Sequence, residues 1–135
     1  MSEHWSGGIY TKPMDERTHI LLTRESLNDD WSLPGGVQEK NESPIETFVR
    51  EIEEEISCIA ETNFLILKIQ EPEHMRYIFE IEPKTEIKES ELVKFFPLIR
   101  LPRNLRERHK QILGCLYRNL IKIERKLSQP LSLAA

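Results

Sequence analysis

The sequence predicts a mixed fold of β-strands and α-helices, and three observations lead to this fold class. Short apolar runs separated by turn-forming residues precede and follow residues 44–56. Residues 44–56 and 105–126 carry apolar residues at helical spacing instead. No composition shift, repeat or low-complexity stretch divides the 135 residues, so we expect one domain over residues 1–127.

Six segments are expected to be strands, and turn residues separate most of them. Asp15 and Glu16 mark a turn between the first two, Asn28 to Asp30 mark a loop, and Pro72 separates the fourth from the fifth. The predicted strands comprise residues 5–12, 19–24, 31–33, 64–69, 75–81 and 92–96.

The helix predicted between the strands has well-defined ends. Ser43 is a suitable N-cap, Pro44 suits the first helical position, and Glu46 completes a capping box. One side of this helix is apolar and is expected to face a core. Its residues are Ile45, Phe48, Val49, Ile52 and Ile56.

The other side of the same helix is acidic. Glu51, Glu54 and Glu55 recur at i, i+3 and i+4, which places them together on one face. Like charges on one face repel, and a hard divalent cation such as Mg²⁺ or Mn²⁺ would relieve that repulsion. Taken alone, an acidic face of this kind is also typical of a solvated helix surface. Gly35 and Gly36, just upstream, allow a tight turn close to a ligand.

The long second helix follows Pro102, and its apolar stripe is interpreted as core packing. We place His109 on the surface of this helix and His19 in a strand, with no catalytic role for either. The apolar stripe contains Leu105, Ile112, Leu113, Leu116 and Leu120. Residues 128–135 are expected to be a flexible tail.

Charge and hydropathy limit the classes of partner. The formal net charge of −4 argues against binding to a nucleic acid polymer, although it does not exclude a nucleotide substrate. The sequence contains no run of 18 apolar residues, so no membrane partner is expected. The N-terminal residues lack the apolar core of a signal peptide. A cytoplasmic location is therefore expected.

The segment from Gly36 to Cys58 resembles the Nudix box, written GX5EX7REUXEEXGU, where U is a bulky aliphatic residue. Gly36 matches the first glycine and Glu42 follows after five residues. Arg50, Glu51 and Ile52 supply REU, and Glu54 with Glu55 supplies EE. Ser57 stands where the family has glycine, and Cys58 follows where an aliphatic residue is usual. We interpret Ser57 as a change at a helix end that removes no charge and no ligand.

The resemblance implies a fold and an activity. It implies an α+β fold, an αβα sandwich in which a mixed β-sheet lies between the box helix and the long C-terminal helix. Nudix enzymes hydrolyse the pyrophosphate bond of a nucleoside diphosphate linked to another group, and they require Mg²⁺, with Mn²⁺ as a substitute. We therefore expect a Nudix-type pyrophosphohydrolase, with a small-molecule nucleotide derivative as substrate and a homodimer as one possible assembly. A non-catalytic ligand-binding regulator on the same fold is the alternative.

The resemblance also assigns roles within the box. Glu54 and Glu55 are expected to bind metal, and Glu51 is either a third ligand or the general base. Arg50 is expected to hold a carboxylate in place, and the carbonyl of Gly35 is a further candidate ligand. Glu53 lies outside the motif and is expected to face solvent.

Three acids and one arginine remain open at this stage. Glu42 is either an outer metal ligand or a solvated loop residue. Arg24 follows the second strand, where many relatives place a phosphate-binding cation, and the alternative is a surface arginine. Glu89 and Glu91 lie where some relatives have an acid that binds metal or acts as base. The substrate is not determined: nucleoside triphosphates, ADP-ribose, dinucleoside polyphosphates and other nucleotide sugars all remain candidates.

Overall fold

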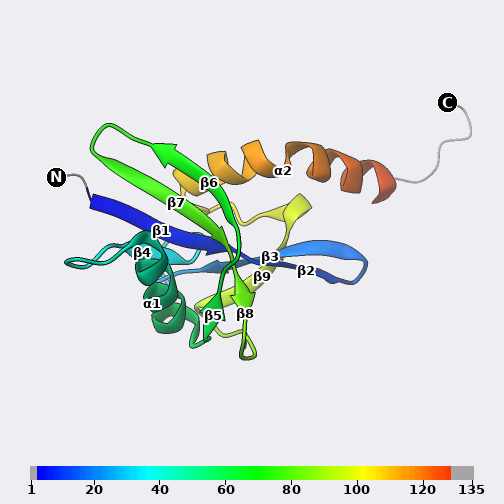
Figure 1. Cartoon of the computed structure of the whole chain (residues 1–135). Coiled ribbons are helices and arrows are strands. Elements are labelled where there is room, and N and C mark those ends of the chain that lie inside the picture. Colours follow the sequence, from blue (N-terminus) through cyan, green and yellow to red (C-terminus); the bar gives the residue numbers. More distant parts are fainter. Residues whose placement is uncertain (1–2, 129–135) are drawn as a thin grey trace, which may run out of the picture.

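Three β-sheets lie between two helices (Figure 1). The structure is a computed structural model that describes residues 3–128, with side chains described as far as residue 118. The elements are β1 (Glu3–Ile9), β2 (Thr11–Met14), β3 (Arg17–Thr23), β4 (Gly35–Val37), α1 (Pro44–Ile56), β5 (Ala60–Glu61), β6 (Leu65–Gln70), β7 (His74–Glu80), β8 (Glu82–Pro83), β9 (Val93–Pro97), the 3-10 helix η1 (Leu98–Arg100) and α2 (Glu107–Ser128).

The largest sheet has the strand order β4-β1-β7-β6 and is mixed. Strand β1 runs parallel to β7 and antiparallel to β4, and β6 pairs with β7 antiparallel. A second, antiparallel sheet has the order β2-β3-β9, and β5 pairs with β8. The expected α+β fold with a mixed sheet is confirmed.

Strand β3 is buried on both of its faces, and its alternating side chains enter two different cores. Ile20 and Leu22 pack in the core that α2 covers with Leu113. Leu21, between them in sequence, packs in the core that α1 covers with Phe48. The sheets are therefore enclosed between the two helices, which lie on opposite sides of the strands in Figure 1.

Helix α1 begins and ends where the sequence predicts. The Ser43 side chain accepts a hydrogen bond from the Glu46 backbone N–H, and the Glu46 side chain accepts one from Ser43, which forms the predicted capping box. Ser57 ends the helix with φ 51° and ψ 40°, the left-handed conformation that the family glycine would adopt more easily. The expected core position of Ile45 is wrong, because its side chain is 52% exposed. Thr47 is buried in the first turns instead.

Two strand predictions differ from the structure. The segment 5–12 is divided at Tyr10, because β1 pairs with β7 whereas β2 pairs with β3, so the chain passes from one sheet to another. Residues 31–33 make only isolated bridges, from Trp31 to Leu105 and from Ser32 to Thr23. The strand in this region is β4, formed by the glycines themselves.

Helix α2 starts two residues later than predicted and continues to Ser128. Leu120 of the predicted apolar stripe lies outside the residues whose side chains the structure describes. Residues 129–135 of the predicted tail lie outside the described residues altogether. No helix in the described range 3–128 is long and apolar enough to cross a membrane.

Candidate active site

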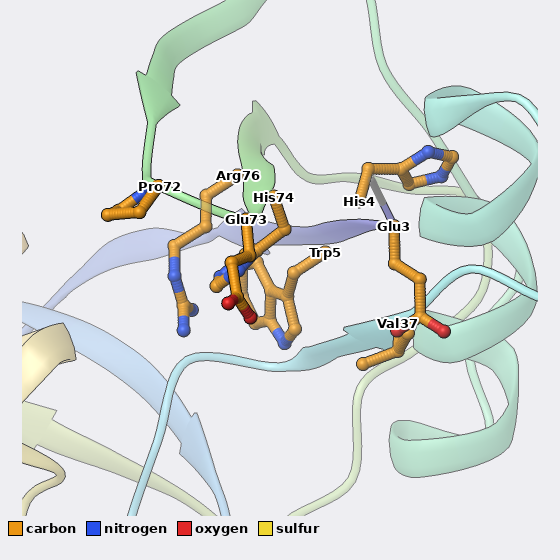
Figure 2. Close-up of a pocket in the computed structure, with 8 residues that line it drawn as sticks. All are labelled: Glu3, His4, Trp5, Val37, Pro72, Glu73, His74 and Arg76. Atoms are coloured by element: carbon orange, nitrogen blue, oxygen red, sulfur yellow. The ribbon is translucent and has the colours of Figure 1, made fainter. Parts of the chain in front are cut away.

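A cavity of about 670 Å³ brings the acidic face of α1 together with glycines and arginines from distant segments. Glu51, Glu54 and Glu55 all line it, and so do Gly35 and Gly36. The remaining lining residues come from β1, β3, β4, β7, the loops beside them and the start of α2. A neighbouring cavity of about 740 Å³, drawn in Figure 2, contains none of the α1 carboxylates but shares Trp5, Val37 and Arg76 with the first.

Glu55 is the most deeply placed of the three carboxylates. Its Oε2 accepts hydrogen bonds from the Thr23 hydroxyl at 3.0 Å and from the Gly35 backbone N–H at 3.2 Å. Burial raises the pKa of Glu55 to about 7, although these two hydrogen bonds oppose the shift and the charge of Glu51 adds to it. This carboxylate therefore lies in a place where a positive charge would stabilise its ionised form.

Glu51 lies against the glycine turn. A Cβ atom added to Gly36 would collide with the Glu51 carboxylate at the end of its side chain, so glycine leaves room for this carboxylate beside strand β4. The Glu51 side chain is 15% exposed, and burial raises its pKa, while the neighbouring Arg50 partly counters the shift. The first glycine of the box thus makes room for an acid of the box.

Arg50 holds three of the box acids through one guanidinium group. It donates to both carboxylate oxygens of Glu42, at 2.7 and 2.9 Å. Its Nη1 donates to Glu51 at 2.9 Å and to Glu54 at 3.2 Å. The fork of Arg50 lowers the pKa of Glu42 to about 2. Glu42 is not among the residues that line the cavity, and both of its carboxylate oxygens accept hydrogen bonds from Arg50.

Arg24 lines the cavity, but its side chain is already engaged. Its guanidinium lies 4.3 Å from the ring centre of Trp31, and its Nε and Nη1 donate to the backbone carbonyls of Glu91 and Leu27. Neither Glu89 nor Glu91 lines the cavity, and the Glu89 carboxylate accepts a hydrogen bond from the Phe95 backbone.

Glu53 is exposed and lines a separate surface hollow beside Ser57. It therefore lies apart from the cavity that the other three glutamates of α1 share, as its position outside the motif predicts.

The expected position of His109 on the surface of α2 is wrong. His109 is 4% exposed rather than on the helix surface, and its Nδ1 accepts a 2.8 Å hydrogen bond from the backbone N–H of Leu33. The Trp5 ring packs beside it, with 5.3 Å between the ring centres. Burial lowers the pKa of His109 to about 4, and three nearby arginines add to the shift. The contact spans 76 residues, so no local pattern signals it.

Three arginines form a second wall of the cavity. Arg76 comes from β7, Arg106 directly precedes α2, and Arg108 lies in its first turn. The buried carboxylate of Glu71 pairs with both Arg76 and Arg108, and His74 Nε2 lies 3.3 Å from it. Burial alone would raise the pKa of Glu71, but these positive groups outweigh burial and lower it.

The donor set around Glu55 fits a hard divalent cation. Glu51, Glu54 and Glu55 offer carboxylate oxygens at one cavity wall, and Gly35 lines the same cavity. Among the described residues, no three Asp, Glu, His or Cys side chains are already gathered in an arrangement that could hold one ion. Arg50 Nη1 contacts one carboxylate oxygen of Glu51 and one of Glu54, so Arg50 links these two acids on the side of the helix that lines the cavity.

Comparison with known proteins identifies the family. The NUDIX domain profile matches residues 8–117. YjhB of Bacillus subtilis, named as a candidate ADP-ribose pyrophosphatase, is 35% identical over 82 residues, which cover 55% of this chain and 39% of YjhB. A crystal structure of a UDP-X diphosphatase superposes with a TM-score of 0.66 at 25% identity, over 89% of this chain and 64% of the other.

A mutT/nudix family protein from Listeria innocua shares the fold over nearly the full length of both chains. Its TM-score is 0.64 at 22% identity, over 93% of this chain and 97% of the other. This chain spans less than two thirds of YjhB and of the UDP-X diphosphatase. Because the domain profile covers most of the chain and includes the whole box from Gly36 to Cys58, the chain belongs to the Nudix family.

Proposed function

We propose that this chain hydrolyses the pyrophosphate bond of a nucleoside diphosphate derivative, with a divalent cation at the carboxylates of α1. The observation that carries the proposal is the convergence of Glu51, Glu54 and Glu55 on one cavity wall, beside Gly35 and Gly36. A regulator on the same fold would not need all three carboxylates at one cavity. Mg²⁺ is the proposed ion and Mn²⁺ its substitute, because both prefer oxygen ligands.

Glu54 and Glu55 are the proposed principal ligands, with Glu51 and the Gly35 carbonyl completing the set. When bound, the cation supplies positive charge against the diphosphate and makes a bound water more acidic. Arg50 is proposed to position Glu51 and Glu54, because its guanidinium donates to both. Glu42 contributes by fixing Arg50 through two hydrogen bonds.

The proton of the attacking water needs an acceptor near the phosphorus. Glu51 and Glu55 are the candidates, since burial raises the pKa of both carboxyl groups above its ordinary value. In Glu55 both hydrogen bonds from described residues go to Oε2, and none goes to Oε1. A proton can therefore be held at Oε1 without loss of either contact.

Arg24 is proposed to act on the substrate through its position at the cavity. Its contacts with Trp31 and two backbone carbonyls hold the guanidinium in place, and its positive charge then faces the space that a phosphate would occupy. The domain that carries this activity is proposed to comprise residues 1–127.

The names of the relatives direct the first substrate tests. ADP-ribose and UDP-sugars should be compared with nucleoside triphosphates and dinucleoside polyphosphates, each with Mg²⁺ or Mn²⁺ and with EDTA. Products identified by chromatography and mass spectrometry define the bond that is cleaved. Ion-dependent cleavage between two phosphorus atoms is expected, with the nucleoside monophosphate among the products of a sugar-linked substrate. Absence of cleavage throughout the panel, in protein that binds the ion, would favour a regulator.

A further inference from the structure

The arginine wall of the cavity carries more positive charge than its direct ion pairs neutralise. Arg76 and Arg108 share one carboxylate, that of Glu71. Arg106 is exposed, and within residues 3–118 no acidic side chain lies within ion-pair distance of it. Among the described residues, the three guanidinium groups therefore have one carboxylate as their ion-pair partner. They line the same cavity as the carboxylates of α1, so the cavity has a cationic part and an anionic part.

The geometry of the wall indicates a built site. The Glu71 side chain is 5% exposed and holds Arg76 and Arg108 from the protein side. The centre of the Trp5 ring lies 5.3 Å from the Arg76 guanidinium, and Figure 2 shows both side chains lining the same pocket. Two of the three guanidinium groups are thus fixed before any ligand binds, which reduces the entropy cost of binding one.

We propose that Arg76, Arg106 and Arg108 bind a phosphate group of the substrate that is not held at the carboxylates of α1. Glu71 is a positioning residue that orients two of these arginines. Guanidinium groups bind phosphate through paired, charge-assisted hydrogen bonds, and this chemistry matches the residues of the wall. The inference deepens the proposed function: it favours nucleotides with a phosphate beyond the cleaved diphosphate over a diphosphate linked to an uncharged sugar.

Anion binding without a divalent ion separates this proposal from hydrolysis. In EDTA the α1 carboxylates repel anions, and Arg24 is already engaged by Trp31 and two backbone carbonyls. We therefore expect inorganic pyrophosphate to bind at the arginine wall. Calorimetry at low ionic strength should detect binding to the unmodified chain that weakens as salt is added. Arg106→Gln and Arg108→Gln should each weaken binding about tenfold or more, as expected for a charge-assisted contact.

Arg103→Gln is the matched control, because it makes the same charge change at an exposed residue that lines neither cavity. It should leave pyrophosphate binding within about twofold. Equal losses in the Arg103 and Arg106 variants would show general charge attraction and overturn the proposal. Undetectable binding to the unmodified chain would do the same. Thermal melts should first show that the compared variants are folded.

Glu71→Gln tests the positioning role of Glu71, because two possible roles of this residue predict opposite changes in pyrophosphate binding. If Glu71 only reduced the positive charge, its removal would tighten pyrophosphate binding. If it orients Arg76 and Arg108, binding should weaken in a folded variant, and tighter binding would refute this role.

With Mg²⁺, Arg106→Gln should also lower the ratio of kcat/KM for a nucleoside triphosphate to that for ADP-ribose by about tenfold. An unchanged ratio would contradict the substrate preference, even if hydrolysis itself is intact.

Discussion

His109 Nδ1 accepts a hydrogen bond from the Leu33 backbone N–H, 2.8 Å away, and so connects the first turn of α2 to the turn that carries Gly35. Gly35 in turn donates its backbone N–H to Glu55. The turn from Leu33 to Gly35 is thus hydrogen-bonded to α2 through His109 and to α1 through Glu55. His109, a buried residue, therefore contacts the turn beside the candidate active site.

We predict that His109 makes the fold sensitive to acid. Its pKa is lowered from 6.5 to about 4 in the folded chain, so the unfolded chain binds more protons between these values. Its stabilising contribution is complete above about pH 6.5 and is lost as the pH falls toward 4. His109→Asn should keep an acceptor near Nδ1 without titrating in this range. Between pH 8 and pH 5, the unmodified chain should lose roughly 2 kcal/mol more unfolding free energy than this variant. Equal losses in urea melts would contradict the prediction.

Without a divalent ion, Glu55 should lower the stability of the fold as the pH rises, which is the opposite of the effect predicted for His109. Its pKa is raised from 4.5 to about 7 in the folded chain, so ionisation of this group weakens the fold as the pH rises between these values. Mg²⁺ or Mn²⁺ should reverse the effect by favouring the carboxylate and releasing its proton. Calorimetry at pH 7 in buffers of different ionisation enthalpy should detect that release. It should be absent in Glu55→Gln, and an unchanged proton release in this variant would place the ion elsewhere.

Gly36→Ala should affect the site more than the fold. The added Cβ meets the end of the flexible Glu51 side chain, which can move aside, so the unfolding free energy should change by within about 1 kcal/mol. The displaced carboxylate should lower turnover roughly 10-fold to 100-fold. Gly8→Ala is the contrasting variant, because its Cβ would press on Ile81 and Phe48 in the core. It should destabilise the fold by about 1–3 kcal/mol. A Gly36 variant with full turnover would show that the close approach to Glu51 is not required.

Ser57→Gly should be neutral or stabilising by up to about 1 kcal/mol, because glycine adopts the observed positive φ without strain. The backbone N–H of residue 57, which donates to the Glu53 carbonyl, is kept in the variant. Denaturant melts of the two proteins measure the difference. A clear loss of stability would show that the serine hydroxyl makes a contact that the fold needs.

The sequence predicts the parts of the fold that local chemistry determines. Ser43 and Glu46 define the start of α1, and Ser57, which is interpreted as lying at a helix end, is the residue at which the helix ends. The division of the first strand at Tyr10 depends on which strands pair, and pairing partners come from distant segments. The strand character of Gly35 and Gly36 was missed for a similar reason, since glycines indicate a turn unless a partner strand is known.

The candidate site likewise has one part that the sequence predicts and another that it does not. The spacing of Glu51, Glu54 and Glu55 is enough to predict a shared face of one helix, and all three line one cavity. The opposite case is the wall formed by Arg76, Arg106 and Arg108. These residues come from β7 and the start of α2, and only the packing of the two segments brings them to Glu71. No motif within the sequence could have predicted this wall.

The most direct test of the account compares two glutamine variants of α1 in one hydrolysis assay. Glu54 lines the cavity, whereas Glu53, the next residue back, faces a separate surface hollow. Both substitutions remove the same charge from the same helix. With the best substrate of the panel and saturating Mg²⁺, Glu54→Gln should lower turnover by ~10²-fold or more, as for other positioned catalytic groups, and Glu53→Gln should retain most activity. Turnover that survives EDTA, or equal damage in the two variants, would contradict the assignment of chemistry to the acidic face of α1.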